Sequence, residues 1–140
     1  MSDLQLPSGI YIIGAHIGFR TVLTPTPHSV SHGRPVISAP ELIPPIVQEW
    51  IIERAGELLP GQYHIRPAHG PSDQYLNYTD EGAFVRNGSP VPWRIQPTPY
   101  GIQIVSDKDL VLRTEYVGAQ VRLAPEDDSP NEAWTLHQLR

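Results

Sequence analysis

Three tryptophans at nearly equal spacing are the feature that most constrains how this chain can fold. Trp50, Trp93 and Trp134 lie 43 and 41 residues apart, and each opens a similar triplet, "WII", "WRI" and "WTL". Self-similarity at a fixed period of about 20 to 50 residues is the sequence signature of a repeated structural unit. We therefore interpret the 140 residues as three copies of one unit.

Each unit opens with a glycine that is followed by an alternating segment. These segments are "GIYII" from Gly9, "GQYHI" from Gly61 and "GIQIV" from Gly101. Such alternation predicts a half-buried strand. Two further strand-like segments follow in each unit: "RTVL" and "PVIS", then "QYLNY" and "AFVR", then "LVLRT" and "AQVRL". The tryptophan segment would be the fourth strand.

Four short strands repeated three times predict an all-β chain with the β-trefoil fold. In this fold a closed six-stranded barrel is capped by three hairpins, and closure helps to remove exposed strand edges. We predict a single domain over residues 1–140, with repeats at about 9–55, 61–97 and 100–140.

One segment, "IVQEWIIERAGELL", also has a helical pattern. Its apolar side chains recur at helical spacing, at Val47, Trp50, Ile51, Ala55 and Leu58. The preceding Pro44 and Pro45 could open a helix. The match of Trp50 to the other two tryptophans favours a strand instead, followed by a turn at Ala55 and Gly56.

Composition and charge exclude several classes of function. A net charge of −5 with ten scattered basic residues argues against a nucleic-acid partner, because phosphate contacts need a basic face. The absence of cysteine excludes a disulfide scaffold, a thiol nucleophile and a thiolate metal site. No signal peptide and no long apolar run are visible, so we expect a cytoplasmic monomer that contacts no membrane.

The proline-rich stretch "TPTPHSVSHGRPVISAP", residues 24–40, is longer than its counterparts. From the opening strand to the third strand the three units need 25, 21 and 19 residues, and the excess of the first unit lies between Leu23 and Pro35. Proline restricts its own geometry and that of the preceding residue, so we expect a stiff, extended loop over residues 24–35. A stiff loop loses little entropy on binding, and a protease cleft binds an extended strand. The other interpretation is a surface insertion without function, since loop length costs little stability.

Over nearly its whole length the sequence resembles the fungal β-trefoil serine protease inhibitors, the mycospin group of mushrooms. The resemblance rests on "LPSGIYII", "RPVISAPELIPPIVQEWIIE" and "SPNEAWTLHQL". It implies a defensive or regulatory inhibitor of a trypsin-like serine protease that needs no cofactor. In some members of this group a basic residue on the loop between the second and third strands fills the primary pocket of the protease. That loop corresponds to residues 24–35.

The matching position for the basic residue falls near His28 and Ser29, where this chain has no arginine or lysine. Arg34 is the only permanent cation of the loop, but Pro35 follows it and disfavours cleavage. Arg20 is followed by Thr21 and suits a protease pocket better, although it is expected to begin a strand. The residues that we expect to contact the protease are His28, Ser29, Val30, Arg34 and Arg20.

Other residue patterns in the sequence bear on alternatives to a serine protease inhibitor. His28 and His32 would share a face only on a helix, which this segment cannot form, so we expect no metal site. No base, orienting group or oxyanion donors for Ser29 can be identified among its neighbours, so we expect no enzyme. We expect the acidic residues Glu126, Asp127 and Asp128 to form a solvated turn and not a calcium site, because calcium needs more oxygen ligands on a suitable loop. Gln48-Glu49-Trp50 matches the Gln-x-Trp signature of ricin-type β-trefoil lectins, but the other units have "VPW" and "EAW". A carbohydrate-binding lectin therefore stays an alternative, as does an inhibitor of cysteine proteases that acts through another loop.

Overall fold

A computed structural model describes residues 6–16, 21–56 and 61–139. Within them the chain forms twelve strands and two short 3-10 helices, η1 (Ile46–Gln48) and η2 (Pro130–Glu132). The strands are β1 (Gly9–Ala15), β2 (Thr21–Pro25), β3 (Arg34–Pro40), β4 (Glu49–Arg54), β5 (Gln62–Pro67), β6 (Gln74–Thr79), β7 (Gly82–Asn87), β8 (Trp93–Thr98), β9 (Gly101–Val105), β10 (Val111–Arg113), β11 (Arg122–Ala124) and β12 (Trp134–Gln138). All twelve lie where the repeat pattern predicts a strand.

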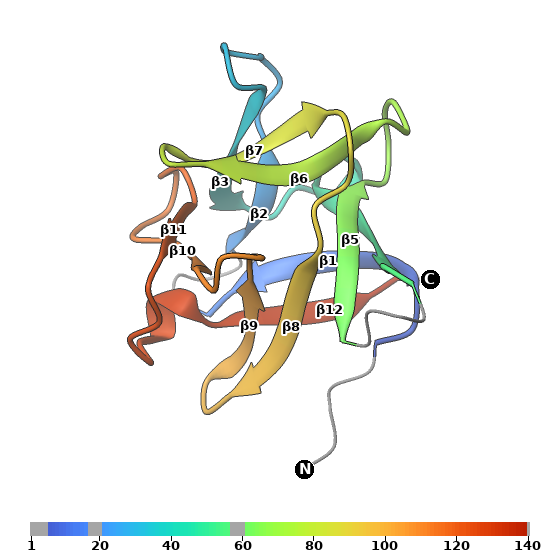
Figure 1. Ribbon diagram of the computed structural model, residues 1–140. Coiled ribbons are helices and arrows are strands. Elements are labelled where there is room, and N and C mark those ends of the chain that lie inside the picture. Colours follow the sequence, from blue (N-terminus) through green and yellow to red (C-terminus); the bar gives the residue numbers. More distant parts are fainter. Residues whose placement is uncertain (1–5, 17–20, 57–60, 140) are drawn as a thin grey trace.

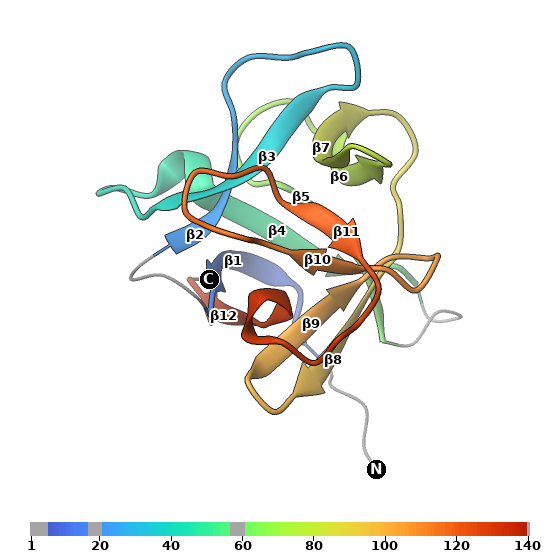
Figure 2. The ribbon, with the colours of Figure 1, turned by 90° about the vertical axis from the view of Figure 1, so that its left-hand side faces the viewer.

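Six of the strands close into a barrel. Antiparallel pairs join β1 to β4, β4 to β5, β5 to β8, β8 to β9, β9 to β12 and β12 back to β1. The other strands pair as three hairpins, β2 with β3, β6 with β7 and β10 with β11. Figures 1 and 2 show these hairpins gathered at one end of the barrel. The predicted β-trefoil is confirmed.

The three tryptophans connect the barrel to its cap. Each has an exposed fraction of 0%. Each indole N–H donates to a backbone carbonyl on the second strand of its own repeat, at 3.0 to 3.1 Å, and the acceptors are Leu23, Leu76 and Leu112. The regular spacing of the tryptophans in the sequence therefore reflects one hydrogen bond, from the indole to the second strand, that recurs in each repeat. Each ring fills the core, and its polar atom fixes one hairpin.

The segment around Trp50, where a helical pattern competes with the tryptophan repeat, forms a strand, as the repeat predicts. The helical pattern is limited to η1, a single turn, and β4 begins directly after it. Trp50 pairs with Tyr11 of β1 and with Pro67 of β5, a double pairing that a helix could not supply. The strand ends at the predicted turn, where Gly56 has the positive φ of +137° that favours glycine. Leu58 lies outside the described residues.

Candidate functional site

The connection between β2 and β3, residues 26–33, projects from the capped end of the molecule. It is the blue-to-cyan loop at the top of Figures 1 and 2. By contrast, Asp80 and Glu81 alone connect β6 to β7. The equally long connection between β10 and β11 is also exposed in its middle, but its end residues Thr114 and Val121 are buried, and backbone hydrogen bonds from Gly118 and Val121 hold it against β3. We call residues 26–33 the β2–β3 loop.

Hydrogen bonds close the β2–β3 loop at its base and at its tip. At the base, the backbone N–H and the hydroxyl of Thr26 both donate to the carbonyl of Pro35, at 2.9 and 2.8 Å. At the tip, Val30 N–H donates to Gly33 O at 2.7 Å and Gly33 N–H donates to Val30 O at 3.1 Å. The expectation of an extended loop is therefore wrong in part, because the chain bends at residues 27 and 28 and turns tightly at residues 30–33. Its shape comes from these bonds as well as from proline.

The second half of the loop lies against strand β7. Gly33 has a φ of +119°, and a Cβ at this position would lie 2.5 Å from the carbonyl oxygen of Val85. The His32 Nε2 atom lies 2.7 Å from Glu81 Oε2, and the imidazole contacts the edge of the Phe84 ring. The loop thus has a docked arm, residues 32–33, and a free arm, residues 27–29.

The predicted protease-contact residues fall into separate places. His28, Ser29 and Val30 are exposed, and Val30 has an exposed fraction of 54%. Arg34 differs from the expectation: it is the first residue of β3, lies opposite Val85 and is half-buried. Its guanidinium donates to Gln74 Oε1 at 3.0 Å, because strand pairing with β7 directs the side chain toward β6. Arg20 lies outside the described residues.

Sequence reasoning missed the role of Gln48, which is fully buried beside strand β2 of the same hairpin. Its amide group donates to Pro40 O at 2.9 Å and to Thr24 Oγ1 at 3.2 Å, and its carbonyl oxygen accepts from Leu42 N–H at 2.8 Å. The amide therefore ties β2 to the segment between β3 and β4. The Gln-x-Trp pattern was the one sequence feature that pointed to Gln48. In this chain the glutamine of that pattern makes hydrogen bonds within the fold.

A cavity of about 310 Å³ lies beside the base of the β2–β3 loop. Its walls are mainly apolar and include Pro25, Pro27, Leu42, Ile46, Val47 and Pro67. Arg34, Glu49 and His69 add polar atoms, and Glu49 Oε1 lies 3.0 Å from His69 Nε2. The Glu49 side chain has an exposed fraction of only 8%. The sequence did not reveal this cavity, because its walls come from segments far apart in the chain.

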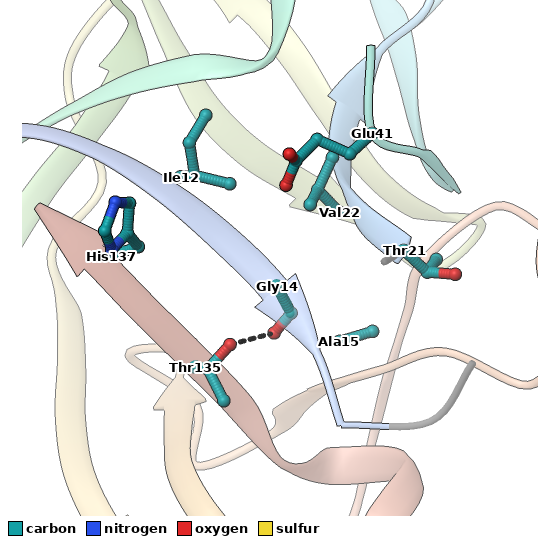
Figure 3. Close-up of a pocket in the computed structure, with 8 residues that line it drawn as sticks. All are labelled: Ile12, Gly14, Ala15, Thr21, Val22, Glu41, Thr135 and His137. Atoms are coloured by element: carbon teal, nitrogen blue, oxygen red, sulfur yellow. Dashed lines mark hydrogen bonds between the residues drawn. The ribbon is translucent and has the colours of Figure 1, made fainter. Parts of the chain in front are cut away.

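A second hollow, of about 230 Å³, lies between β1, β2 and β12 (Figure 3). The close-up shows the Glu41 carboxylate between the side chains of Ile12 and Val22, with His137 on the neighbouring strand. Both of these polar residues are exposed. Thr21 also lines the hollow, and its buried hydroxyl has no hydrogen-bond partner within the described part of the chain. Because its charged groups are solvated, this hollow is a weaker candidate site than the cavity beside the loop.

The acidic residues 126–128 of the third repeat are exposed, as expected, and one of them, Asp127, also binds an arginine. Arg113 Nη1 lies 2.9 Å from Asp127 Oδ2 and 3.1 Å from Glu132 Oε2. Glu132 occupies the place that Gln48 has in the first repeat, two residues before the tryptophan, and is buried. Burial raises the pKa of Glu132. Side-chain hydrogen bonding with Glu132, then with Ser129, lowers the pKa of Asp127 from 3.8 to about 2.

These shifts predict how acid affects stability. A lowered folded-state pKa means that Asp127 stabilises the fold above its ordinary value of 3.8, and that this contribution is lost as the pH falls toward 2. The raised pKa of Glu132 acts in the opposite sense, because its ionisation opposes folding as the pH rises through 4.5. We expect Asp127→Asn to flatten the rise of the unfolding free energy between pH 2 and 4, measured by urea denaturation. The control is Asp128→Asn, which keeps the left-handed backbone that asparagine tolerates; equal slopes for both variants would contradict the assignment.

Two further features bear on function. No helix in the described part of the chain is both long enough and apolar enough to cross a membrane. Over the same residues, no group of three or more histidine, aspartate or glutamate side chains is placed to hold a metal ion. His28 and His32 accordingly do not belong to such a group.

Comparison with known proteins supports the fold. No protein-family model and no curated protein matches the chain. Among solved structures it is similar to the designed three-fold symmetric protein ThreeFoil, with a TM-score of 0.74, 23% identity and coverage of 94% of this chain and 99% of the other. It is also similar to the Rhizoctonia solani agglutinin, with a TM-score of 0.75, 18% identity and coverage of 98% of this chain and 99% of the other. A Polyporus squamosus lectin bound to a human-type influenza-binding epitope has a TM-score of 0.76 and 21% identity, with coverage of 97% of this chain and 51% of the other.

The chain is a β-trefoil. Identities this low establish the shared fold and no more than the fold. Two of the similar structures are named as an agglutinin and a lectin, and none of these three is named as a protease inhibitor. The function has to be argued from the site of this chain itself.

Proposed function

We propose that this protein inhibits a serine protease by placing the free arm of its β2–β3 loop in the protease cleft. One observation carries the proposal: His28, Ser29 and Val30 are exposed on a projecting loop whose two ends are both held. An exposed backbone that is already ordered loses little entropy when it enters a cleft. The resemblance to mushroom trefoil inhibitors points to the same loop.

The anchored ends explain why such a loop would inhibit rather than be digested. On one side, Thr26 is bound to Pro35 by two hydrogen bonds. On the other side, Gly33 is packed against Val85, and His32 is paired with Glu81. A cut between these anchors would leave both new chain ends near each other. The released amine would then compete with water for the acyl-enzyme, and the peptide bond would form again.

The structure supports a protease other than trypsin. Arg34 is the only arginine or lysine in residues 24–35, and its guanidinium already bonds to Gln74. Withdrawing it would break that bond and the pairing of Arg34 with Val85. A trypsin-like pocket needs an exposed cation. The trypsin preference that the resemblance implies therefore has no support in the described loop.

The proposal is tested by titrating the protein against trypsin, chymotrypsin, pancreatic elastase, subtilisin and papain. We expect tight inhibition of at least one serine protease, and a loss of about 100-fold or more when residues 27–32 are replaced by a Gly-Ser sequence of equal length. Tyr116→Ser is the control, since Tyr116 has an exposed fraction of 68% but lies in another hairpin connection. Inhibition that survives the replacement, or no inhibition of any serine protease, would refute the proposal. Inhibition of papain alone would favour the cysteine-protease alternative.

Carbohydrate binding is a second candidate, favoured by the similarity to an agglutinin and a lectin. The cavity beside the loop offers apolar walls for a sugar ring, and Glu49 and His69 could bond its hydroxyl groups. A glycan array compares the parent with His69→Ala and with the control His137→Ala. Binding that is lost only in His69→Ala would support a lectin. Absence of glycan binding by the parent would remove this candidate.

A further inference from the structure

We infer that the reactive bond of the loop is the peptide bond between Ser29 and Val30, and that the partner is a protease with a small primary pocket. The inference rests on the proposed function and gives it a bond and a partner class. It follows from the hydrogen bonds of the loop backbone, taken residue by residue.

A protease cleft binds an extended segment through its backbone N–H and C=O groups, so these groups must be free in the inhibitor. The N–H of Thr26 is bonded to Pro35, and both backbone groups of Val30 are bonded to Gly33. Pro27 has no N–H to offer. The backbone groups of His28 and Ser29 have no hydrogen bond within the described residues. His28 and Ser29 are therefore the residues that a cleft can bind.

The rest of the loop is unsuited to the primary pocket for other reasons. Ser31 and His32 form the two-residue turn between Val30 and Gly33, so their backbone is not extended. The His32 imidazole is also paired with Glu81 at 2.7 Å. Arg34 belongs to strand β3 and precedes Pro35. The choice is thus between the bond that follows His28 and the bond that follows Ser29.

The position of the leaving nitrogen decides between these two bonds. If the bond after Ser29 is cut, the leaving nitrogen is that of Val30, which is held 2.7 Å from the carbonyl oxygen of Gly33, a residue of the docked arm. If the bond after His28 is cut, the leaving nitrogen is that of Ser29, which has no such partner among the described residues. Only the first amine is kept in place for the reverse reaction. Ser29 is therefore the primary residue.

The chemistry is the ordinary acyl transfer of a serine protease, but the acyl-enzyme returns to the intact peptide bond instead of being hydrolysed. The protease serine oxygen attacks the carbonyl carbon of Ser29 and gives its proton to the catalytic histidine. The histidine passes that proton to the Val30 nitrogen as the C–N bond breaks, which leaves Ser29 as an acyl-enzyme. The held amine then attacks the same carbon, returns the proton through the histidine and releases the protease serine. Water has little chance to hydrolyse the ester.

The side chain of Ser29 identifies the class of protease. It is small and uncharged, whereas trypsin has an aspartate in its primary pocket and chymotrypsin has a large hydrophobic slot. Elastase has a small primary pocket. An elastase-type enzyme is therefore the expected partner.

Moving the specificity to trypsin tests the inference. We expect the parent to inhibit pancreatic elastase and not trypsin, and Ser29→Arg to gain trypsin inhibition by about 1,000-fold while losing elastase inhibition. Ser31→Arg is the matched control, two residues away on the same exposed loop, and should stay an elastase inhibitor. After incubation with a trace of elastase, mass spectrometry should find the chain cut after residue 29. Circular dichroism confirms that each variant is folded.

The outcomes separate this inference from the proposed function. If the chain is cut at another bond, or if Ser31→Arg rather than Ser29→Arg gains trypsin inhibition, the assignment of the bond is wrong while the protein is still an inhibitor. If elastase inhibition is unchanged in Ser29→Arg, the assignment is equally wrong. If neither the parent nor any variant inhibits a serine protease, the proposed function fails, and the inference fails with it.

Discussion

Replacing Trp50 with alanine is expected to lower the free energy of unfolding by about 4 kcal/mol. The side chain is completely buried between the barrel and the β2–β3 hairpin. Its removal leaves a large cavity and also leaves the carbonyl of Leu23 without the indole N–H that donates to it at 3.0 Å. Guanidinium denaturation followed by circular dichroism would measure the loss.

Two further variants separate the contributions of Trp50. Trp50→Phe keeps an aromatic ring but removes the N–H, so we expect an intermediate loss of about 1 to 3 kcal/mol. Tyr116→Ala changes an exposed aromatic residue and should stay within about 0.5 kcal/mol of the parent. A loss below about 1 kcal/mol for Trp50→Ala would show that Trp50 does not hold the hairpin to the barrel.

Replacing Gln48 with glutamate is expected to lower the free energy of unfolding by about 3 kcal/mol or more at pH 7. The Gln48 side-chain nitrogen donates to Pro40 O and Thr24 Oγ1. A carboxylate at position 48 would have no proton to donate, and it would turn its charge toward the Pro40 carbonyl in a fully buried site. Urea denaturation at pH 7 and at pH 4 gives the test. The deficit should shrink at the lower pH, because a protonated carboxyl group can donate again.

The reverse change in the third repeat is the matched control. Glu132 accepts from the N–H of Asp127 and from Arg113, and a glutamine oxygen could still accept from one of them. Arg113 would keep its bonds to Glu115 and Asp127. We therefore expect Glu132→Gln to cost about 1 kcal/mol or less at pH 7. If Gln48→Glu and Glu132→Gln lowered the free energy of unfolding equally, the surroundings of the two positions would not favour an amide at position 48 and a carboxylate at position 132.

The sequence alone predicted the strands and the way they repeat. Alternating apolar residues mark each strand, because side chains on a strand point alternately to the core and to solvent. The tryptophan period located the three units, and it outweighed the helical pattern around Trp50. This succeeded because one contact, from indole to second strand, recurs in every repeat and so leaves a periodic trace.

The tertiary structure decided which of the candidate site residues lie together. The proline-rich composition indicated an exposed loop, but the free backbone of Ser29 and the bonded backbone of Val30 depend on the turn that Val30 forms with Gly33. Pairing between β3 and β7 took Arg34 away from the loop tip. The cavity beside the loop joins Pro27, Val47 and His69, which are 20 or more residues apart. Local patterns determine strands because each strand carries its own alternation, whereas a site joins distant segments and exists only after they have packed.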